Sequence, residues 1–117
     1  MKENLKISLV QSNIFWKNTE QNLAHFANLI SNIKQTDLIL LPEMFNTAFC
    51  PNSKNLAENI KGKTIRWMKK IAKEKKCSIT GSIMVKENLK LYNRLVWVEK
   101  NGSICTYDKR HLFSLIK

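Results

Sequence analysis

Glu43 is the first residue whose type and position could do chemistry. It stands in the sequence Leu-Leu-Pro-Glu-Met at positions 40–44, at the end of the apolar run 37–41. This run does not alternate polar and apolar residues, which is typical of a strand covered on both faces. Pro42 lacks the backbone N–H that would continue a strand ladder, so Glu43 follows at the carboxyl end of the strand.

The position of Glu43 suggests a general base. We expect partial desolvation to raise the pKa of its carboxyl group, as a base that works near neutral pH requires. The spacing fits an ordinary interpretation equally well, in which Glu43 begins a loop and pairs with one of the many lysines. The sequence around Glu43 alone leaves both interpretations open.

Lys109 is the second such residue, in the sequence Tyr-Asp-Lys-Arg-His-Leu-Phe at positions 107–113. It comes just past a predicted strand, as Glu43 does. An ammonium group beside a carboxylate in a partly buried site can stabilise a developing oxyanion. A Lys-Arg-His cluster is also typical of a solvated turn, so this segment alone does not establish a catalytic role.

The elements that would position these two residues follow the order β-α-β-α-β-β-β, which indicates an α/β fold. Composition and spacing predict strands at 5–11, 37–41, 77–85, 89–99 and 103–107. Apolar residues at helical spacing predict two helices. The second helix has its inner face at Ile65, Met68, Ile71 and Ala72. The first helix connects the first two strands in a βαβ unit, whose strands are expected to be parallel.

Local signals mark the ends of these elements. Asn18 can cap the first helix, and Gln21 can reach back to it in the manner of a capping box. A polar loop at 46–63 leads to the second helix. The pair Asn101-Gly102 joins the last two strands and favours a type I′ hairpin turn.

One face of the predicted sheet lacks a covering layer. Two helices cover one face, yet apolar residues follow one another on both sides of the strand at 95–98. A strand of this kind is expected to be buried on both faces. The sequence therefore indicates a chain that is incomplete or oligomeric.

Length and composition limit the classes of protein. The 117 residues are 44% hydrophobic and 25% charged, as expected for a single soluble globular domain. No apolar stretch reaches the roughly 18 residues that cross a membrane, and residues 1–6 lack the apolar core of a signal peptide. We therefore expect no membrane association and a cytoplasmic location.

The net charge of +11 comes from 20 Lys and Arg against 9 Asp and Glu, and it raises nucleic acid as a partner. The lysines are spread along the chain, and the densest group, at 69–76, lies on or just past the second helix. Such a group is usually a solvated helix face. No nucleic-acid-binding motif accompanies the charge, so a basic binding module is the less favoured alternative.

The three cysteines, Cys50, Cys77 and Cys105, show neither a CxxC pair nor metal-ligand spacing with the two histidines. A disulfide framework and a zinc site are therefore not expected, and neither is a cofactor. Cys77 and Cys105 lie in or beside predicted strands and are expected to be packing residues.

Taken together, the segments 40–45 and 107–113 resemble the nitrilase superfamily of carbon–nitrogen hydrolases, and most of all its bacterial omega-amidase-like branch. The similarity runs over the whole chain. It includes Gln11 at the end of the first strand, the helix after Trp16, the sequence Ile-Thr-Gly-Ser at 79–82 and the sequence Tyr-Asn-Arg at 92–94.

The resemblance implies a fold and a site. The fold is a four-layer α-β-β-α sandwich, of which residues 1–117 would be the N-terminal half and a partial domain. Glu43 matches the family's general base, and Lys109 matches the residue that stabilises the tetrahedral intermediate. Phe49 and His111 match positions that could border the substrate. The implied substrate is a small carboxylate-bearing amide, hydrolysed to acid and ammonia through a cysteine thioester, and full-length relatives are expected to be homo-oligomers.

The nucleophile of that family is a cysteine downstream of the lysine, in a Cys-Tyr-Asp or Cys-Trp-Asp context that these 117 residues do not contain. Cys50 lies seven residues past Glu43, but its surroundings do not resemble the nucleophile segment. Two hypotheses follow. The chain is the N-terminal portion of an omega-amidase-like hydrolase, inactive alone, or it is a truncated, non-catalytic homologue that associates with another chain.

Overall fold

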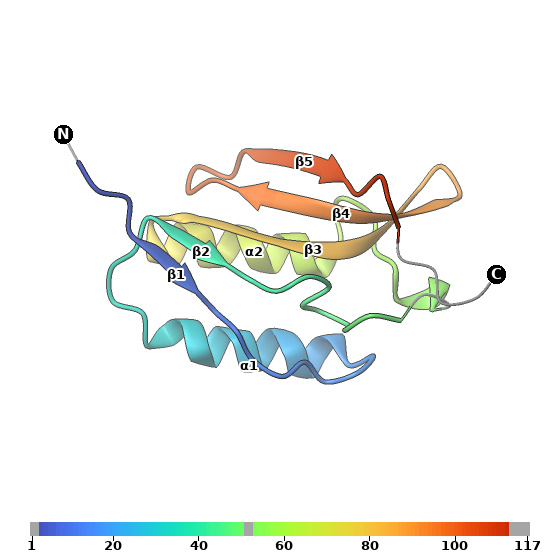
Figure 1. Cartoon of the computed structure of the whole chain (residues 1–117), viewed down its shortest axis with the longest axis horizontal. Coiled ribbons are helices and arrows are strands. Elements are labelled where there is room, and N and C mark those ends of the chain that lie inside the picture. The colour runs from blue at the N-terminus through green and yellow to red at the C-terminus, as the bar shows by residue number, and fades with distance from the viewer. Residues whose placement is uncertain (1–2, 51–52, 113–117) are drawn as a thin grey trace.

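Five strands form one mixed sheet in the computed structural model, which describes residues 3–50 and 53–112 (Figure 1). In sheet order they are β1 (Ile7–Leu9), β2 (Leu38–Leu40), β3 (Ser78–Glu87), β4 (Lys90–Val98) and β5 (Ile104–Asp108). The strands β1, β2 and β3 are parallel to one another, while β4 and β5 continue the sheet as antiparallel hairpins. The predicted order of elements is confirmed, and the short 3-10 helix η1 (Lys54–Leu56) is added to it.

The helix α1 (Thr19–Ser31) begins where its cap was predicted. The Asn18 side chain accepts a hydrogen bond from the Gln21 N–H at 3.0 Å. Gln21 does not return a bond to the backbone of Asn18 as in a full capping box. Its Oε1 instead accepts from the Asn18 side-chain amide at 3.1 Å, while the Asn18 N–H bonds to the Phe15 carbonyl.

The helix α2 (Lys63–Lys75) buries the predicted inner face and packs beside α1. Most lysines of the group at 69–76 are exposed, as predicted. Lys75 differs, because it is half-buried and its ammonium donates to the Ile33 carbonyl at 2.7 Å, just past the end of α1. In the described part of the chain, neither α-helix has the length and apolar character needed to cross a membrane.

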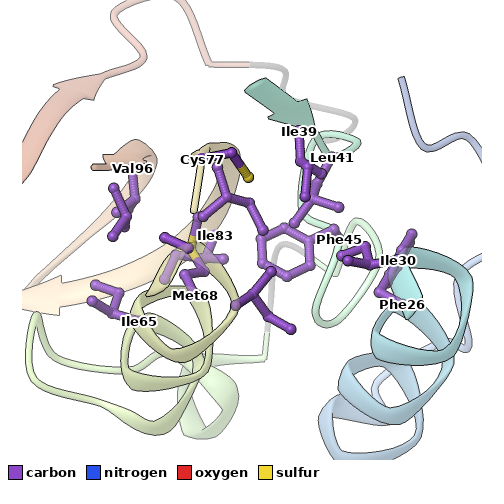
Figure 2. Close-up of a cluster of buried hydrophobic side chains, with 14 of the residues drawn as sticks. Phe26, Ile30, Ile39, Leu41, Phe45, Ile65, Met68, Cys77, Ile83 and Val96 are labelled. Carbon is purple, nitrogen blue, oxygen red and sulfur yellow. The ribbon is translucent and has the colours of Figure 1, made fainter. Parts of the chain in front are cut away.

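Side chains from both helices and one face of the sheet form the main core. In Figure 2 the Phe45 ring lies between Phe26 and Ile30 of α1 and Met68 of α2. Its ring centroid lies 5.9 Å from that of Phe26, with the two planes perpendicular. Phe45 is therefore the residue through which the segment after β2 joins both helices to the sheet.

The turns of the two hairpins differ from the sequence prediction. Type I′ geometry needs positive φ at both central residues, but in the β4–β5 connection only Gly102 has positive φ, at 91°. The Gly102 N–H bonds to the Glu99 carbonyl, and the Glu99 N–H bonds to the Ser103 carbonyl. The loop is thus a three-residue connection with glycine in the bulge position, and the predicted type I′ turn is wrong. Positive φ at both central positions occurs instead between β3 and β4, at Asn88 and Leu89.

The loop predicted at 46–63 is less solvated than its composition suggests. Asn46, Thr47 and Ser53 are buried, and Glu58 forms a bridge to Val85 at the edge of β3. Backbone bonds join Glu58 to β3 on both sides, from its own N–H to Met84 and from Lys86 to its carbonyl. The part of the segment around Glu58 is therefore fixed against the sheet.

The sheet face opposite the helices carries exposed apolar side chains. Strand alternation places Leu95 and Tyr107 on this face, because their neighbour Val96 points into the helix-side core. Ile7 and Leu9 lie on the same face, with 46% and 74% of their surfaces exposed. The predicted apolar character of this second face is confirmed. That a further layer covers it stays a prediction.

Candidate active site

Glu43 lies where the sequence predicts it, at the carboxyl end of β2. The Leu41 N–H still bonds to the Thr80 carbonyl of β3 at 2.8 Å, and Pro42 then ends the pairing. The carboxyl group emerges on a corner in which Met44 has the left-handed φ of 53°. Such a conformation is uncommon for a residue with a side chain and persists where surrounding contacts impose it.

Those contacts come from β3 and the core. The Met44 N–H donates to the Ser82 Oγ at 2.9 Å, and the Met44 side chain is buried against Cys50 and Met84. The next residue, Phe45, is fully buried. A Cβ atom at Gly81 would lie 2.8 Å from the Phe45 ring, so the glycine gives the ring room to approach β3. Contacts with β3 and with the core thus fix the corner that carries Glu43.

The structure brings Glu43 and Lys109 together across 66 residues of sequence. The Lys109 Nζ donates to the Glu43 Oε2 at 2.9 Å. The Asn93 side-chain amide donates to the same oxygen at 2.7 Å, and the Asn93 carbonyl accepts from the Lys109 N–H at 2.9 Å. The carboxylate, the ammonium and the amide therefore form one connected cluster, in which the carboxyl ends of β2 and β5 lie beside the interior of β4.

The ionisation of Glu43 corrects the prediction made from its position. The hydrogen bond from Lys109, followed by the one from Asn93, holds the pKa of Glu43 below its ordinary value, and these bonds outweigh the raising effect of desolvation. The side chain is 56% exposed, so burial is slight. The predicted raised pKa is therefore wrong for this arrangement, and Glu43 is a carboxylate at neutral pH.

Several hollows adjoin the pair. A groove of about 710 Å³ on the open sheet face is lined by both residues and by Leu95, Tyr107 and His111. A second hollow, of about 360 Å³, is lined by both residues together with Met44 and Phe49. A smaller one, of about 120 Å³, is lined by Lys109 and mainly by apolar side chains, Phe49 among them. The predicted border residues His111 and Phe49 thus lie near the pair in different hollows, and their contact with a substrate stays a prediction. Phe113, the last residue of the second motif, lies outside the described residues.

The three cysteines lie apart from this cluster. Cys50 is buried, and its Sγ is 3.4 Å from the Ala48 carbonyl. Cys77 is buried in the main core, and burial raises the pKa of its thiol. Cys105 is exposed on β5, four residues before Lys109, which in a strand corresponds to roughly 13 Å. Among the described residues, no hydrogen bond joins any of these thiols to Glu43.

Asn93 and Ser82 also hold the Glu43 corner, although neither is recognisable from the sequence as a site residue. What relates Asn93 to Lys109 is the register of β4 and β5, which the structure shows and the local sequence does not specify. Because Arg94 pairs with Asp108, the preceding Asn93 and the following Lys109 lie on one face at the same end of the hairpin.

The described residues contain no group of three or more His, Cys, Asp or Glu side chains placed to hold a metal ion.

Comparison with known proteins identifies the family. The model of the family described as carbon-nitrogen hydrolase matches residues 6–117. The chain belongs to this family. The resemblance drawn from the two motifs is thereby confirmed.

Curated relatives of this carbon–nitrogen hydrolase chain include omega-amidases. Omega-amidase YafV of Yersinia enterocolitica is 38% identical over 113 residues, which cover 95% of this chain and 43% of that protein. The 2-oxoglutaramate amidase of Bacillus subtilis strain 168 is 32% identical over 114 residues, covering 94% and 44%. The chain thus spans less than half the length of these two relatives.

Solved structures agree on the fold. A CN-hydrolase superfamily protein from Xanthomonas campestris, determined with an arsenic adduct in its active site, superposes with a TM-score of 0.92 at 34% identity. The match covers 96% of this chain and 43% of that one. A carbon–nitrogen hydrolase from Helicobacter pylori shares the fold at 21% identity, with a TM-score of 0.79 over 92% of this chain and 40% of its own. The five-stranded sheet with two helices is therefore the carbon–nitrogen hydrolase fold over the part that these chains share.

Proposed function

We propose that this carbon–nitrogen hydrolase chain supplies the general base and the oxyanion-stabilising cation of an omega-amidase-type active site. The observation that supports the proposal is the contact of Glu43 with Lys109, two residues from separate motifs that meet at the ends of different strands. A solvated loop glutamate would not require a second strand residue, Asn93, to donate to the same oxygen. The names of the relatives that are 32–38% identical support the reaction class.

The reaction divides between these two side chains and a thiol. Glu43 accepts the thiol proton, and the thiolate attacks the amide carbon of the substrate. The Lys109 ammonium stabilises the negative charge that forms on the carbonyl oxygen. Glu43 returns the proton to the leaving nitrogen as the C–N bond breaks, so ammonia departs and a thioester remains. Water, deprotonated by Glu43, then attacks the thioester, and the thiol leaves with the proton.

The thiol in this proposal is none of the three cysteines described above. Two of them are buried in packing clusters, and Cys105 is separated from Lys109 by most of a strand. The exposed sheet face beside the groove offers a surface on which a further layer of polypeptide could bring the thiol to Glu43. The 117 residues taken alone are accordingly proposed to lack amidase activity, because loss of a covalent nucleophile costs several orders of magnitude in rate.

The proposed substrate is a small amide that carries a carboxylate. The groove beside Glu43 and Lys109 is also lined by Arg110 and His111, which can attract an anionic group. Apolar atoms dominate the rest of its lining, among them those of Leu95 and Tyr107. An aliphatic dicarboxylic acid monoamide such as 2-oxoglutaramate combines these features, and it matches the name of the Bacillus relative.

A chimera tests the proposal. Residues 1–117 of this chain would replace the matching segment of the Yersinia omega-amidase, and ammonia release from 2-oxoglutaramate would be measured. We expect the chimera to be active and Glu43→Gln or Lys109→Met to lower kcat/KM by about 10³-fold or more. Glu20→Gln on α1, which removes an exposed ion pair with Lys63 of α2, is the matched control and should leave the rate unchanged. A folded chimera that retains activity with Gln at position 43 would overturn the assignment.

A further inference from the structure

Asn93 connects the two residues of the candidate pair through two different groups. Its side-chain Nδ2 donates to the Glu43 Oε2 at 2.7 Å, and its backbone carbonyl accepts from the Lys109 N–H at 2.9 Å. The residue lies on β4, on the open face of the sheet, and lines the groove together with both partners. It is half-buried, whereas Glu43 and Lys109 are more exposed, so it is the more firmly placed member of the cluster.

Both donors to Glu43 bind the same oxygen. Lys109 and Asn93 each donate to Oε2, and within residues 3–50 and 53–112 the other oxygen, Oε1, accepts no hydrogen bond. An ionised carboxyl group offers about four lone-pair sites on its two oxygens. Two charge-assisted bonds at Oε2 fix the plane of the group and leave Oε1 as the oxygen that is free to take a proton.

We propose that Asn93 is a positioning residue, which holds Oε2 of Glu43 so that Oε1 receives the proton of the nucleophile. The inference rests on the proposed function, since it concerns the base of that reaction. Lys109 alone would hold the carboxylate through one flexible side chain. Asn93 adds a second donor from a paired strand, so the carboxylate keeps its direction while the ammonium turns toward the substrate oxygen.

An amide suits this role because it carries no charge and does not titrate. It orients the carboxylate over the whole working pH range and leaves Lys109 as the single cation beside the substrate carbonyl. An aspartate at position 93 would place a second carboxylate within hydrogen-bond distance of the first, where two like charges disfavour joint ionisation. The identity of the side chain, beyond its size, therefore matters at this position.

Substitution of Asn93 removes its side-chain contact with Glu43 and keeps its backbone contact with Lys109. The bond from the Lys109 N–H is made to the backbone carbonyl and is retained with any side chain. Asn93→Leu keeps the approximate volume and removes only the donor to Glu43. Asn93→Asp keeps the shape and replaces the donor by an acceptor. Asn28→Leu, at an exposed position of α1, is the matched control for an Asn-to-Leu change outside the site.

The first measurement is the titration of Glu43 itself, followed by carboxyl-carbon NMR in the 117-residue chain. Asn93→Leu should raise the pKa of Glu43 toward its ordinary value, because one of the two bonds to the ionised form is lost, and Asn93→Asp should raise it further. Asn28→Leu should not change it. An unchanged Glu43 titration in Asn93→Leu would overturn the inference, whatever the activity.

The second measurement is the kinetics of the chimera described above. Asn93→Leu should lower kcat by about 10- to 100-fold with little change in KM, since misplacement of a catalytic group affects the reaction more than substrate binding. The acid limb of its kcat/KM profile should move to higher pH together with the Glu43 titration.

If the parent chimera is active and Asn93→Leu has full kcat, the role of Asn93 is overturned and the proposed function is not. An inactive parent chimera would overturn the proposed function, and the positioning role with it, while the NMR titration would still report whether the contact exists.

Discussion

Arg94 and Asp108 are joined by two hydrogen bonds across the β4–β5 hairpin, where Arg94 adjoins Asn93 and Asp108 adjoins Lys109. The Arg94 Nε and Nη2 donate to the two carboxylate oxygens of Asp108 at 2.6 and 3.1 Å. The two residues are register partners on the helix side of the sheet, so Asn93 and Lys109 project from the opposite face. The ion pair therefore fixes the part of the hairpin that carries Lys109, the proposed cation, and Asn93, its amide neighbour.

Replacement of Arg94 should loosen this end of the hairpin. Its side chain is only 8% exposed, and its guanidinium also donates to Glu87 at 3.0 Å. Hydrogen bonds to Asp108 and Glu87 raise the pKa of Arg94, so it stays charged. Lysine cannot form the two parallel bonds to Asp108, so we expect Arg94→Lys to lower the free energy of unfolding by about 1–3 kcal/mol in urea titrations. The control Arg66→Lys removes an exposed bond to a backbone carbonyl and should cost much less. Equal losses at the two positions would contradict this account.

Gly81→Ala should destabilise the chain by crowding the Phe45 ring. The added methyl group would lie 2.8 Å from the ring and 3.0 Å from the Leu41 Cβ, closer than core atoms approach one another. Overpacking of this kind costs about 1–3 kcal/mol, which a thermal melt followed by circular dichroism would detect. The cost should be smaller in a Phe45→Leu background, because the smaller side chain makes room. Additive losses in that double-mutant cycle would show that the ring is not the cause.

Glu58 should stabilise the start of α2. The N-cap position of this helix is Gly62, which has no side chain, and the Glu58 Oε1 instead accepts the Thr64 N–H at 2.8 Å. Asn46, buried behind the Glu43 corner, donates to both Glu58 and Thr64. We expect Glu58→Ala to lower the free energy of unfolding by about 1–2 kcal/mol, as loss of a helix cap does. Glu74→Ala, exposed on the same helix, is the control, and a loss as large there would argue against a capping role.

Much of the fold follows from local sequence patterns. The unbroken apolar run before Pro42 predicts the buried strand, and apolar spacing predicts the inner face of α2. The predicted type of the β4–β5 turn is wrong because Asn101-Gly102 also fits a three-residue connection with a bulged glycine. Which of the two turn types forms depends on strand register and not on the dipeptide. Local sequence alone does not specify that register.

The candidate site is less predictable, because its properties arise from contacts that are distant in the sequence. The position of Glu43 suggests burial and a raised pKa, yet donors 50 and 66 residues away lower it. Strand patterning places Asn93 on a sheet face, but only the three-dimensional arrangement shows that its amide and Lys109 bind one oxygen of Glu43. Sequence reasoning thus finds the residues that could do chemistry and misses the one that connects them.

The acid sensitivity of the folded chain should depend on Glu43. Its pKa is held below the ordinary value of 4.5 in the folded state, so the ionised form binds Lys109 and Asn93 and stabilises the fold above that value. This contribution is lost as the pH falls through the lower, folded-state pKa, because the unfolded chain then binds more protons.

Urea titrations between pH 7 and pH 3 should show a smaller decline in the free energy of unfolding for Glu43→Gln than for the parent chain. Lys109→Met should also flatten the curve, since the bond from Lys109 is the leading cause of the lowered pKa. Glu20, whose pKa is likewise lowered by Lys63, tests specificity, because its carboxylate is more exposed than that of Glu43 and its effect should disappear at high salt. A decline that is identical in Glu43→Gln and the parent would show that the Glu43 cluster contributes nothing to stability.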